Sequence, residues 1–377
     1  MDLIYTSSNP KRQKIEEEEK VVENEDRITQ LPDSLLHHIL SLLPTKDAVA
    51  TCILSTRWQD LWMSVTNLDL KCTVFAKTLR ALKVKLSCDL ELPETICLPS
   101  LTVLHLCYFN FEDEVSIDKL FSGLPVLEEL ELTHCKWNMF TATTSIPTLK
   151  SLTLDFSLDP GDDVYGCLRL NVENLMYFSY TGNLKVDLLL ETSSSLVDAS
   201  IHVGGFVRHD EASSHAANLF NGIRFAKSIK IDNDTVERLW DIVEEEKMIP
   251  KFGYLTSLEV DATVTSETSD VLKDFLQNSP ILESLVVRKV HGGRWARDST
   301  TQCPMLNLKT CSLLYFSGQA PEVSFLKFVL KWCAVLERIK LFCAKCLSSN
   351  PEKLAYINKQ LEKALLKVSK SCVIEFL

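Results

Sequence analysis

The sequence predicts an α/β solenoid with a curved parallel sheet, and three observations lead to this fold class. A short apolar unit, written L-x-x-L-x-L, recurs along most of the chain in one register. Its copies follow one another at intervals of 21 to 30 residues. One copy cannot bury its own apolar face, so neighbouring copies have to stack. The eleven copies start at Leu79, Leu101, Leu127, Leu149, Leu175, Leu196, Ala226, Leu255, Leu282, Leu308 and Leu336.

Each copy of the unit reads as a short β-strand. The residues three and five positions after the start are largely apolar, as Leu104 and Leu106 are after Leu101. Residues two apart share one face of a strand, so these side chains face the core together. The period and the spacing are the signature of leucine-rich repeats, which form a horseshoe lined by a parallel sheet.

The composition narrows the function classes. A formal net charge of −11 disfavours nucleic acid and anionic membrane as main partners, because phosphate binding needs a basic face. Glycine is sparse, with 11 residues, and no phosphate-binding glycine loop is found. The 13 cysteines show no regular framework and no signal peptide precedes them, which indicates reduced, mostly buried thiols in the nucleus or the cytoplasm. No apolar run reaches the roughly 18 residues that span a bilayer.

The first 25 residues are dense in charge and are predicted to form a disordered tail. They contain an acidic run from Glu16 to Glu19 and, before it, a basic cluster from Lys11 to Lys14. On a flexible tail such a cluster can act as a nuclear-import signal, and it can equally belong to an ordinary solvated tail. Both alternatives stay open.

Three short amphipathic helices are predicted between residues 26 and 62. Pro32 and Asp33 suit the first turn of a helix. Backbone N–H groups in that turn have no partner within the helix, so the N–H that proline lacks is not missed, and a carboxylate there interacts favourably with the positive end of the helix dipole. This helix stops at Pro44 and carries apolar residues at helical spacing, namely Leu35, Leu36, Ile39, Leu42 and Leu43. These apolar residues occupy a wider part of the helix surface than two neighbouring short helices can bury. We therefore expect the solenoid or a partner protein to cover the remaining apolar side chains.

The stretch from Asp26 to Trp62 reads D-R-I-T-Q-L-P-D-S-L-L-H-H-I-L-S-L-L-P-T-K-D-A-V-A-T-C-I-L-S-T-R-W-Q-D-L-W and resembles the F-box motif of plant F-box proteins. In that family the motif docks on the small Skp-type adaptor of a cullin-based ubiquitin ligase. The resemblance implies that the adaptor is contacted by Leu31, Pro32, Leu35, Ile39, Leu42 and Leu43. It also implies that the F-box is held together and joined to the repeats by Trp58, Leu61 and Trp62.

Two later stretches extend this resemblance. L-F-S-G-L-P-V-L-E-E-L-E-L-T-H-C, from Leu120 to Cys135, looks like the repeats of the same plant group. The segment from Leu308 to Leu341, with Y-F-S-G and F-L-K-F-V-L-K-W-C-A-V-L-E-R-I, is similar to the group's C-terminal FBD segment. The predicted division is therefore a tail over 1–25, an F-box over 26–65, leucine-rich repeats over 66–302, and FBD-like terminal repeats with a cap over 303–377.

Helices are predicted on the outer side of the repeats and at the end of the chain. The long gap between the copies at Leu196 and Ala226 is expected to hold a helix near 211–221, and apolar residues at helical spacing place two more within 232–248 and over 268–278. A further amphipathic helix starts at Pro321, and Asn350 caps the last helix, whose first residue is Pro351. Cys372 to Phe376 reads as a final strand. The last helix and strand would cap the open end of the solenoid.

No motif in the sequence carries catalytic or metal-binding chemistry. Cys343 and Cys346 form a single C-x-x-C, whereas a zinc site needs four ligands. His37 and His38 are adjacent and do not share a helix face, which favours a surface or interface role. Neither G-x-S-x-G nor H-E-x-x-H occurs. The sequence predicts a non-catalytic protein without a metal or a cofactor.

The inner face of the sheet is the predicted target-binding surface. On each strand the residue between the last two apolar positions, and the residue before the middle one, should point to the concave side. These two rows are small, polar and mixed in charge, which suits a protein or peptide, although much of the face can equally be merely solvated. The residues selected for target binding are His105, Glu129, Glu131, Ser151, Thr153, Tyr177, Ser179, Lys230 and Glu259.

Together these features predict the substrate-recognition subunit of a Skp–cullin–F-box (SCF) ubiquitin ligase. The F-box would dock the adaptor and the repeats would hold an unknown target protein near the ubiquitin-charged enzyme. The alternative is an interaction scaffold or decoy that uses the same repeats without assembling a ligase.

Overall fold

The computed structural model describes residues 31–43, 48, 51, 56–58, 61, 78–89, 96–111, 113–137, 141–157, 166–192, 194–204, 212–244, 249–293, 295, 305–333, 335–368 and 372–377. The predicted tail, the basic cluster from Lys11 to Lys14, Trp62 and most of the second and third F-box helices lie outside these residues. None of the described helices combines the length and the apolar character that crossing a membrane requires.

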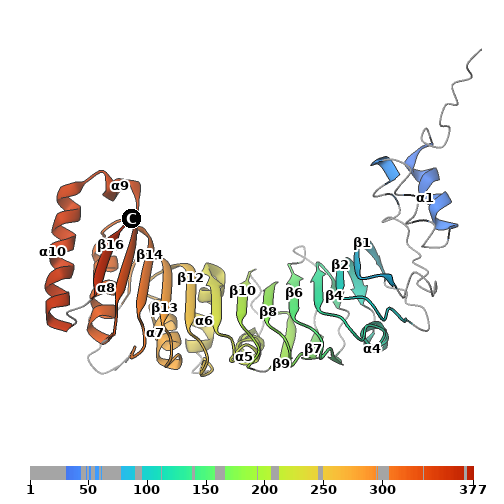
Figure 1. Cartoon of the computed structure of the whole chain (residues 1–377), viewed down its shortest axis with the longest axis horizontal. Helices are drawn as coiled ribbons and strands as arrows, with labels where there is room; N and C mark the ends of the chain where they lie inside the picture. The colour runs from blue at the N-terminus through green and yellow to red at the C-terminus, as the bar shows by residue number, and fades with distance from the viewer. Residues whose placement is uncertain are drawn as a thin grey trace, which may run out of the picture.

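The repeats form a solenoid whose strands stand side by side along an arc (Figure 1). The described residues contribute 13 strands to its main sheet. Twelve follow one path, and all pairs along it are parallel. In order they are β1 (Ala81–Asp89), β2 (Val103–Phe111), β3 (Glu129–Thr133), β6 (Ser151–Phe156), β8 (Tyr177–Gly182), β10 (Asp198–Val203), β11 (Ser228–Asp232), β12 (Ser257–Val264), β13 (Ser284–Val290), β14 (Thr310–Phe316), β15 (Arg338–Cys343) and β16 (Val373–Phe376). A short strand, β4 (Lys136–Trp137), pairs with the end of β2.

The predicted repeat register is confirmed. Each of the strands from β1 to β15 on this path begins two residues after a predicted copy start, and burial alternates along it, as in β6 and β12. On the path from β2 to β15, the residue before each strand also donates its N–H to its counterpart in the preceding repeat, at 2.8 Å from Thr102 to Arg80 and from Lys309 to Glu283. Stacking therefore satisfies the backbone along the whole sheet, which one repeat could not do alone.

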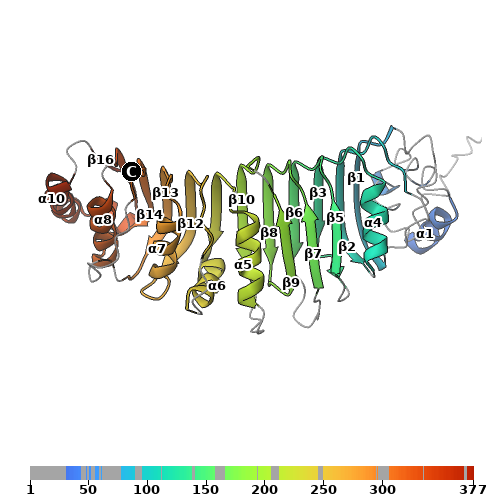
Figure 2. The same ribbon diagram turned by 90° about the horizontal axis from the view of Figure 1, so that it is seen from below.

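The outer side of the arc carries helices and a second sheet (Figures 1 and 2). The helices are α4 (Glu114–Ser122), α5 (Ala212–Gly222), α6 (Asn233–Glu244) and α7 (Ser269–Asn278), and the last three match the predicted outer helices. Between α4 and α5 the return segments instead form a three-stranded parallel sheet of β5 (Thr141–Ser145), β7 (Gly166–Asn171) and β9 (Val186–Glu191). The sequence analysis did not predict this sheet.

One apolar core runs through the repeats from β1 to the C-terminal elements. The residue that starts each copy is fully buried from Leu101 to Leu255, and Leu308 and Leu336 are equally buried. Leu79, the first copy start, is only partly buried against this core. The core therefore grows by one layer per repeat, as the L-x-x-L-x-L pattern requires.

The C-terminal elements are α8 (Ala320–Trp332), β15, α9 (Lys345–Ser348), α10 (Pro351–Val368) and β16. The last helix and the last strand, α10 and β16, are those predicted to cap the solenoid, and β16 ends the main sheet beside β15. The Asn350 side chain accepts the Lys353 N–H at 3.0 Å, as expected of a cap residue. Gly318 has φ of +68°, and a Cβ there would lie 2.3 Å from Cδ1 of Ile357 on α10. Glycine adopts this positive φ without strain and leaves room for the Ile357 side chain before α8.

The described F-box residues form a separate small core. Helix α1 (Asp33–Ser41) buries Leu36 and Leu40 against Ala48 and Trp58, and Trp58 lies in the short 3-10 helix η2 (Thr56–Trp58). The predicted role of Trp58 in holding this unit together is thus consistent with its place in the core.

Candidate functional site

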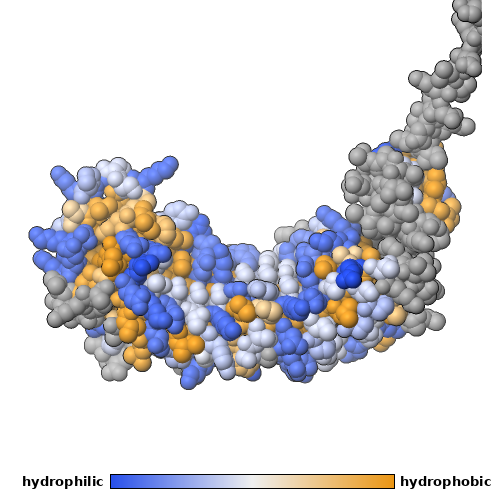
Figure 3. Space-filling model, in the orientation of Figure 1, coloured by the Kyte–Doolittle hydropathy of each residue, from blue (hydrophilic) through white to orange (hydrophobic). Residues whose placement is uncertain are grey.

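Helix α1 presents a second apolar stripe that its own core does not use. Leu35, Ile39 and Leu42 lie one helical turn apart and are 49%, 38% and 73% exposed. Leu36 and Leu40, one position further along, are fully buried. Figure 3 shows apolar surface at this helix. Aliphatic side chains repeating at three- and four-residue spacing on an open helix face are typical of a protein-docking surface.

The start of α1 is fixed by Arg57. Its guanidinium forms an ion pair with Asp33, and its Nη2 donates to the Leu31 carbonyl at 2.7 Å. Both side chains of the pair are well exposed, so its contribution to stability is small. The contacts instead fix the entry of the chain into α1.

The structure divides the predicted adaptor-binding residues into two groups. Pro32 is exposed, together with the stripe of Leu35, Ile39 and Leu42. Leu31 and Leu43 are partly buried against the F-box core. Four of the six residues are therefore open to a partner, and two mainly support the helix that presents them.

The two rows predicted for the concave face lie side by side across the sheet. Strand pairing aligns Ala81, Val103, Glu129, Ser151, Tyr177, Asp198, Ser228, Ser257, Ser284, Thr310 and Arg338. It also aligns Lys83, His105, Glu131, Thr153, Ser179, Ser200, Lys230, Glu259, Val286, Ser312 and Lys340. None of these residues is buried, whereas the side chains between them are buried in strands such as β3, β10 and β14.

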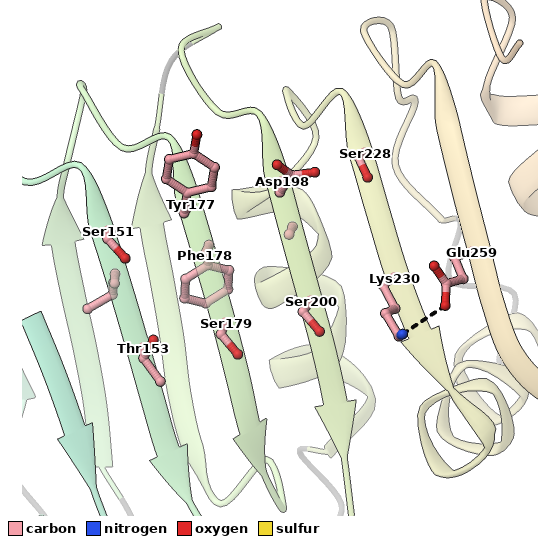
Figure 4. A pocket seen from close by; sticks show the side chains of 12 residues that line it. Ser151, Thr153, Tyr177, Phe178, Ser179, Asp198, Ser200, Ser228, Lys230 and Glu259 are labelled. Atoms are coloured by element: carbon pink, nitrogen blue, oxygen red, sulfur yellow. Dashed lines mark ion pairs between the residues drawn. The ribbon is translucent and has the colours of Figure 1, made fainter. Parts of the chain in front are cut away.

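A hollow of about 320 Å³ lies at the middle of this face (Figure 4). It is lined by strands β6, β8, β10, β11 and β12. Six of the nine residues selected for target binding line it, namely Ser151, Thr153, Tyr177, Ser179, Lys230 and Glu259. His105, Glu129 and Glu131 lie outside it, on β2 and β3.

Several charged side chains of the face are paired across neighbouring strands. Lys230 and Glu259 lie 2.7 Å apart, and their hydrogen bond raises the pKa of Lys230 above its ordinary value. The ring of His105 lies between two carboxylates, with Nε2 at 2.6 Å from Glu129 and Nδ1 at 3.1 Å from Glu131. These pairs hold long side chains in place across the strands and so shape the surface that a partner would meet.

A third outward row was not considered in the sequence analysis. It lies one residue beyond the last apolar position of each unit, two residues after the preceding outward row, and the period of two could have revealed it. His202, Asp232 and Asp234 gather near it, with one ligand-type atom of each within 4.8 Å of the others. Asp232 already accepts a hydrogen bond from the Thr235 N–H at 3.1 Å at the start of α6 and forms an ion pair with His202. Asp232 therefore already has a structural role at the junction of β11 and α6, with His202 reaching it from β10.

The cysteines correct one expectation, since only three of the nine described ones are buried. These are Cys135, Cys311 and Cys333, and all nine are free thiols. Burial raises the pKa of Cys135 and of Cys311 to about 12. A thiol with such a pKa stays protonated and inert at neutral pH.

Comparisons with known proteins match both parts of the chain. The F-box domain model matches residues 28–70, and the model described as the At1g61320/AtMIF1 LRR domain matches residues 69–341. The F-box/FBD/LRR-repeat protein At4g26340 of Arabidopsis thaliana is 27% identical, over 84% of this chain and 92% of its own length. The F-box/LRR-repeat protein At2g42730 and the FBD-associated F-box protein At5g60610, both from the same plant, are each 25% identical, over 93% and 81% of this chain and 97% of their own lengths.

Proposed function

The chain belongs to the F-box/LRR-repeat family, and from this premise we propose that it is the substrate-recognition subunit of an SCF-type ubiquitin ligase. The F-box would dock a Skp-type adaptor and, through it, a cullin–RING ligase. The repeats would bind a target protein on the concave face. The proposal places this work in the nucleus or the cytoplasm, in keeping with the free thiols of the described cysteines.

The observation that carries the proposal is the open stripe of Leu35, Ile39 and Leu42. Helix α1 buries one apolar stripe in the F-box core and leaves a second one exposed. Such a helix can pack against its own domain on one side and bind a partner protein on the other. Full burial of an exposed aliphatic side chain contributes about 1.5–3 kcal/mol, and these three are already partly covered, so an adaptor would gain a fraction of that from each. The stripe would therefore supply the apolar centre of a larger contact with an adaptor of complementary shape.

The inferred mechanism is proximity without bond chemistry in this chain. A receptor that holds its target beside the ubiquitin-charged enzyme raises the local concentration of the target lysines. The concave face is suited to holding a protein because most of its outward residues are polar, none of them is buried, and cross-strand pairs such as Lys230 with Glu259 hold some of the long side chains in place.

The test is capture of a purified plant Skp-type adaptor by the full chain, followed by size-exclusion chromatography with a cullin fragment. Replacing Leu35 and Leu42 by Ser is expected to weaken adaptor binding at least about tenfold, because two exposed aliphatic contacts are lost. The matched control is Val115→Ser on α4, which changes an equally exposed aliphatic residue on the repeats. It should leave adaptor binding unchanged.

A scaffold or decoy is the second candidate, and it predicts a different result. If the unmutated chain binds neither the adaptor nor the adaptor–cullin complex, the ligase proposal fails and the scaffold replaces it. If Val115→Ser weakens capture as much as the α1 variant does, the assigned docking stripe is wrong.

A further inference from the structure

Two tyrosines near opposite ends of the concave face are turned outward by the same local distortion. In β2 the side chains of Leu104 and Leu106 are buried, and alternation would bury position 108 next. Tyr108 is instead 40% exposed, with φ of +65°, and Phe109 takes the core position. In β14 Tyr315 is likewise 57% exposed, with φ of +51°, and the following residue, Phe316, is buried.

Each outward ring lies beside a cation from the preceding strand. Lys85 Nζ lies 5.4 Å from the ring centre of Tyr108, and the Arg288 guanidinium lies 5.6 Å from that of Tyr315. His134, which also has a positive φ, stacks on Tyr108 at 4.9 Å. A left-handed backbone costs a non-glycine residue about 1–3 kcal/mol, and such positions concentrate at ligand-binding sites. Tyrosine and arginine are also the residues that most often dominate protein interfaces.

The face between the two tyrosines is acidic. The outward positions of β6, β8, β10, β11 and β12 carry one lysine, Lys230, and five carboxylates, namely Asp155, Asp198, Asp232, Glu259 and Asp261. Two of these carboxylates lie beside another basic side chain: Asp232 forms an ion pair with His202, and Asp261 lies 3.3 Å from Arg288. The Asp198 side chain is exposed and forms no hydrogen bond or ion pair with the described residues. The field over this middle region is therefore negative.

We propose that the concave face binds an extended segment of a partner protein with a basic middle and an apolar or planar side chain toward each end. The basic residues would face the carboxylates between β6 and β12, and the flanking side chains would pack on Tyr108 and Tyr315. Charge complementarity selects this partner, and the same charge excludes nucleic acid. Eight strand steps of about 4.8 Å separate β2 from β14 along the sheet, which corresponds to roughly 12 residues of extended chain.

This inference rests on the proposed target-binding role of the repeats but not on ligase assembly. Adaptor capture uses α1, which lies outside the concave face. Variants on the face should therefore capture adaptor normally, so that failure of one proposal can be distinguished from failure of the other.

The experiment selects binders from a displayed library of random 14-residue peptides on the immobilised full chain. The expected result is enrichment of Lys and Arg in the middle of the peptides and of aromatic or aliphatic residues toward both ends. A synthetic copy of an enriched peptide is then titrated against variants. Asp198→Asn with Asp232→Asn and Asp261→Asn should weaken it at least about tenfold, and Tyr108→Ser with Tyr315→Ser should do the same.

The controls separate binding from folding. Asparagine keeps the shape of each aspartate and its capping ability at position 232, so the charge variant should unfold at the temperature of the unmutated chain. Glu114→Gln with Asp118→Asn removes exposed charge from α4 and should leave peptide affinity unchanged. Enrichment of acidic or uncharged peptides, absence of any enrichment, or equal affinity in the face variants would overturn the proposal.

Discussion

Some of the outward side chains that line the hollow already form ion pairs or hydrogen bonds within the protein, and others form none with the described residues. Lys230 and Glu259 bind each other at 2.7 Å, so a partner has to compete with or extend that pair. Tyr177 and Asp198 form no side-chain hydrogen bond, ion pair or ring contact with the described residues. A partner that binds these two displaces only water, so they are the stronger candidates for contact energy in the hollow.

Tyr180 lies on β8, one of the strands that line the hollow, with its side chain in the core, and it offers a test of how that core is packed. Its ring is fully buried, and its hydroxyl lies at the Leu184 backbone, where burial raises the pKa of the hydroxyl and a hydrogen bond lowers it. Tyr180→Ala removes a whole buried ring and is therefore expected to lower the free energy of unfolding by about 3–5 kcal/mol, measured by chemical denaturation. Tyr177→Ala on the same strand, where the side chain is 49% exposed, should cost much less, and equal losses for the two substitutions would contradict this assignment of Tyr180 to the core.

Sequence reasoning placed single residues well wherever strand alternation held. It located His105, Glu131 and Tyr177 on the concave face, because the L-x-x-L-x-L unit sets which positions face outward. It could not place Tyr108 or Tyr315, since alternation alone assigns both to the core. At both positions the φ angle is positive and the following phenylalanine takes the core position instead, which strand alternation does not predict. The binding roles of the concave residues stay proposals.

Single helices could be predicted from the sequence where a capping residue and a clear apolar stripe mark them. The final helix was predicted from Asn350 and Pro351 and begins there in the structure. The sheet of β5, β7 and β9 was not predicted, because its strands lie between the copies of the L-x-x-L-x-L unit that the sequence analysis aligned. Val186, Leu188 and Leu190 are buried in alternation, which marks a strand in retrospect. In this part of the solenoid strands replace the outer helices.

The start of α8 depends on one buried carboxylate. Glu322 is fully buried and accepts hydrogen bonds from the Gln319 N–H at 2.7 Å and from the N–H and hydroxyl of Ser317. Glu322→Ala leaves these donors without their acceptor and should lower the free energy of unfolding by about 3 kcal/mol. Denaturation followed by circular dichroism measures the change. Glu352→Ala, in the exposed first turn of α10, is the matched control, and an equal effect of both substitutions would refute this role for Glu322.

The whole molecule combines an exposed apolar helix face in the N-terminal F-box with a curved repeat sheet whose concave face is largely polar. The repeat period predicted the horseshoe, because each added unit extends a core that no unit could close alone. The partners could not be predicted from periodicity, since binding energy concentrates in a few contacts whose identity depends on three-dimensional shape. The division into F-box, repeats and FBD-like cap at residues 65/66 and 302/303 likewise stays a prediction.

The most direct test of the central claim is hydrogen–deuterium exchange of the full chain with and without a plant Skp-type adaptor. The adaptor should slow exchange over residues 33–43 of the F-box, where Leu35, Ile39 and Leu42 would become buried, and should leave strands β10 to β13 unchanged. Unchanged exchange over 33–43 at saturating adaptor, or protection confined to the repeat sheet, would contradict the assignment of α1 as the docking helix.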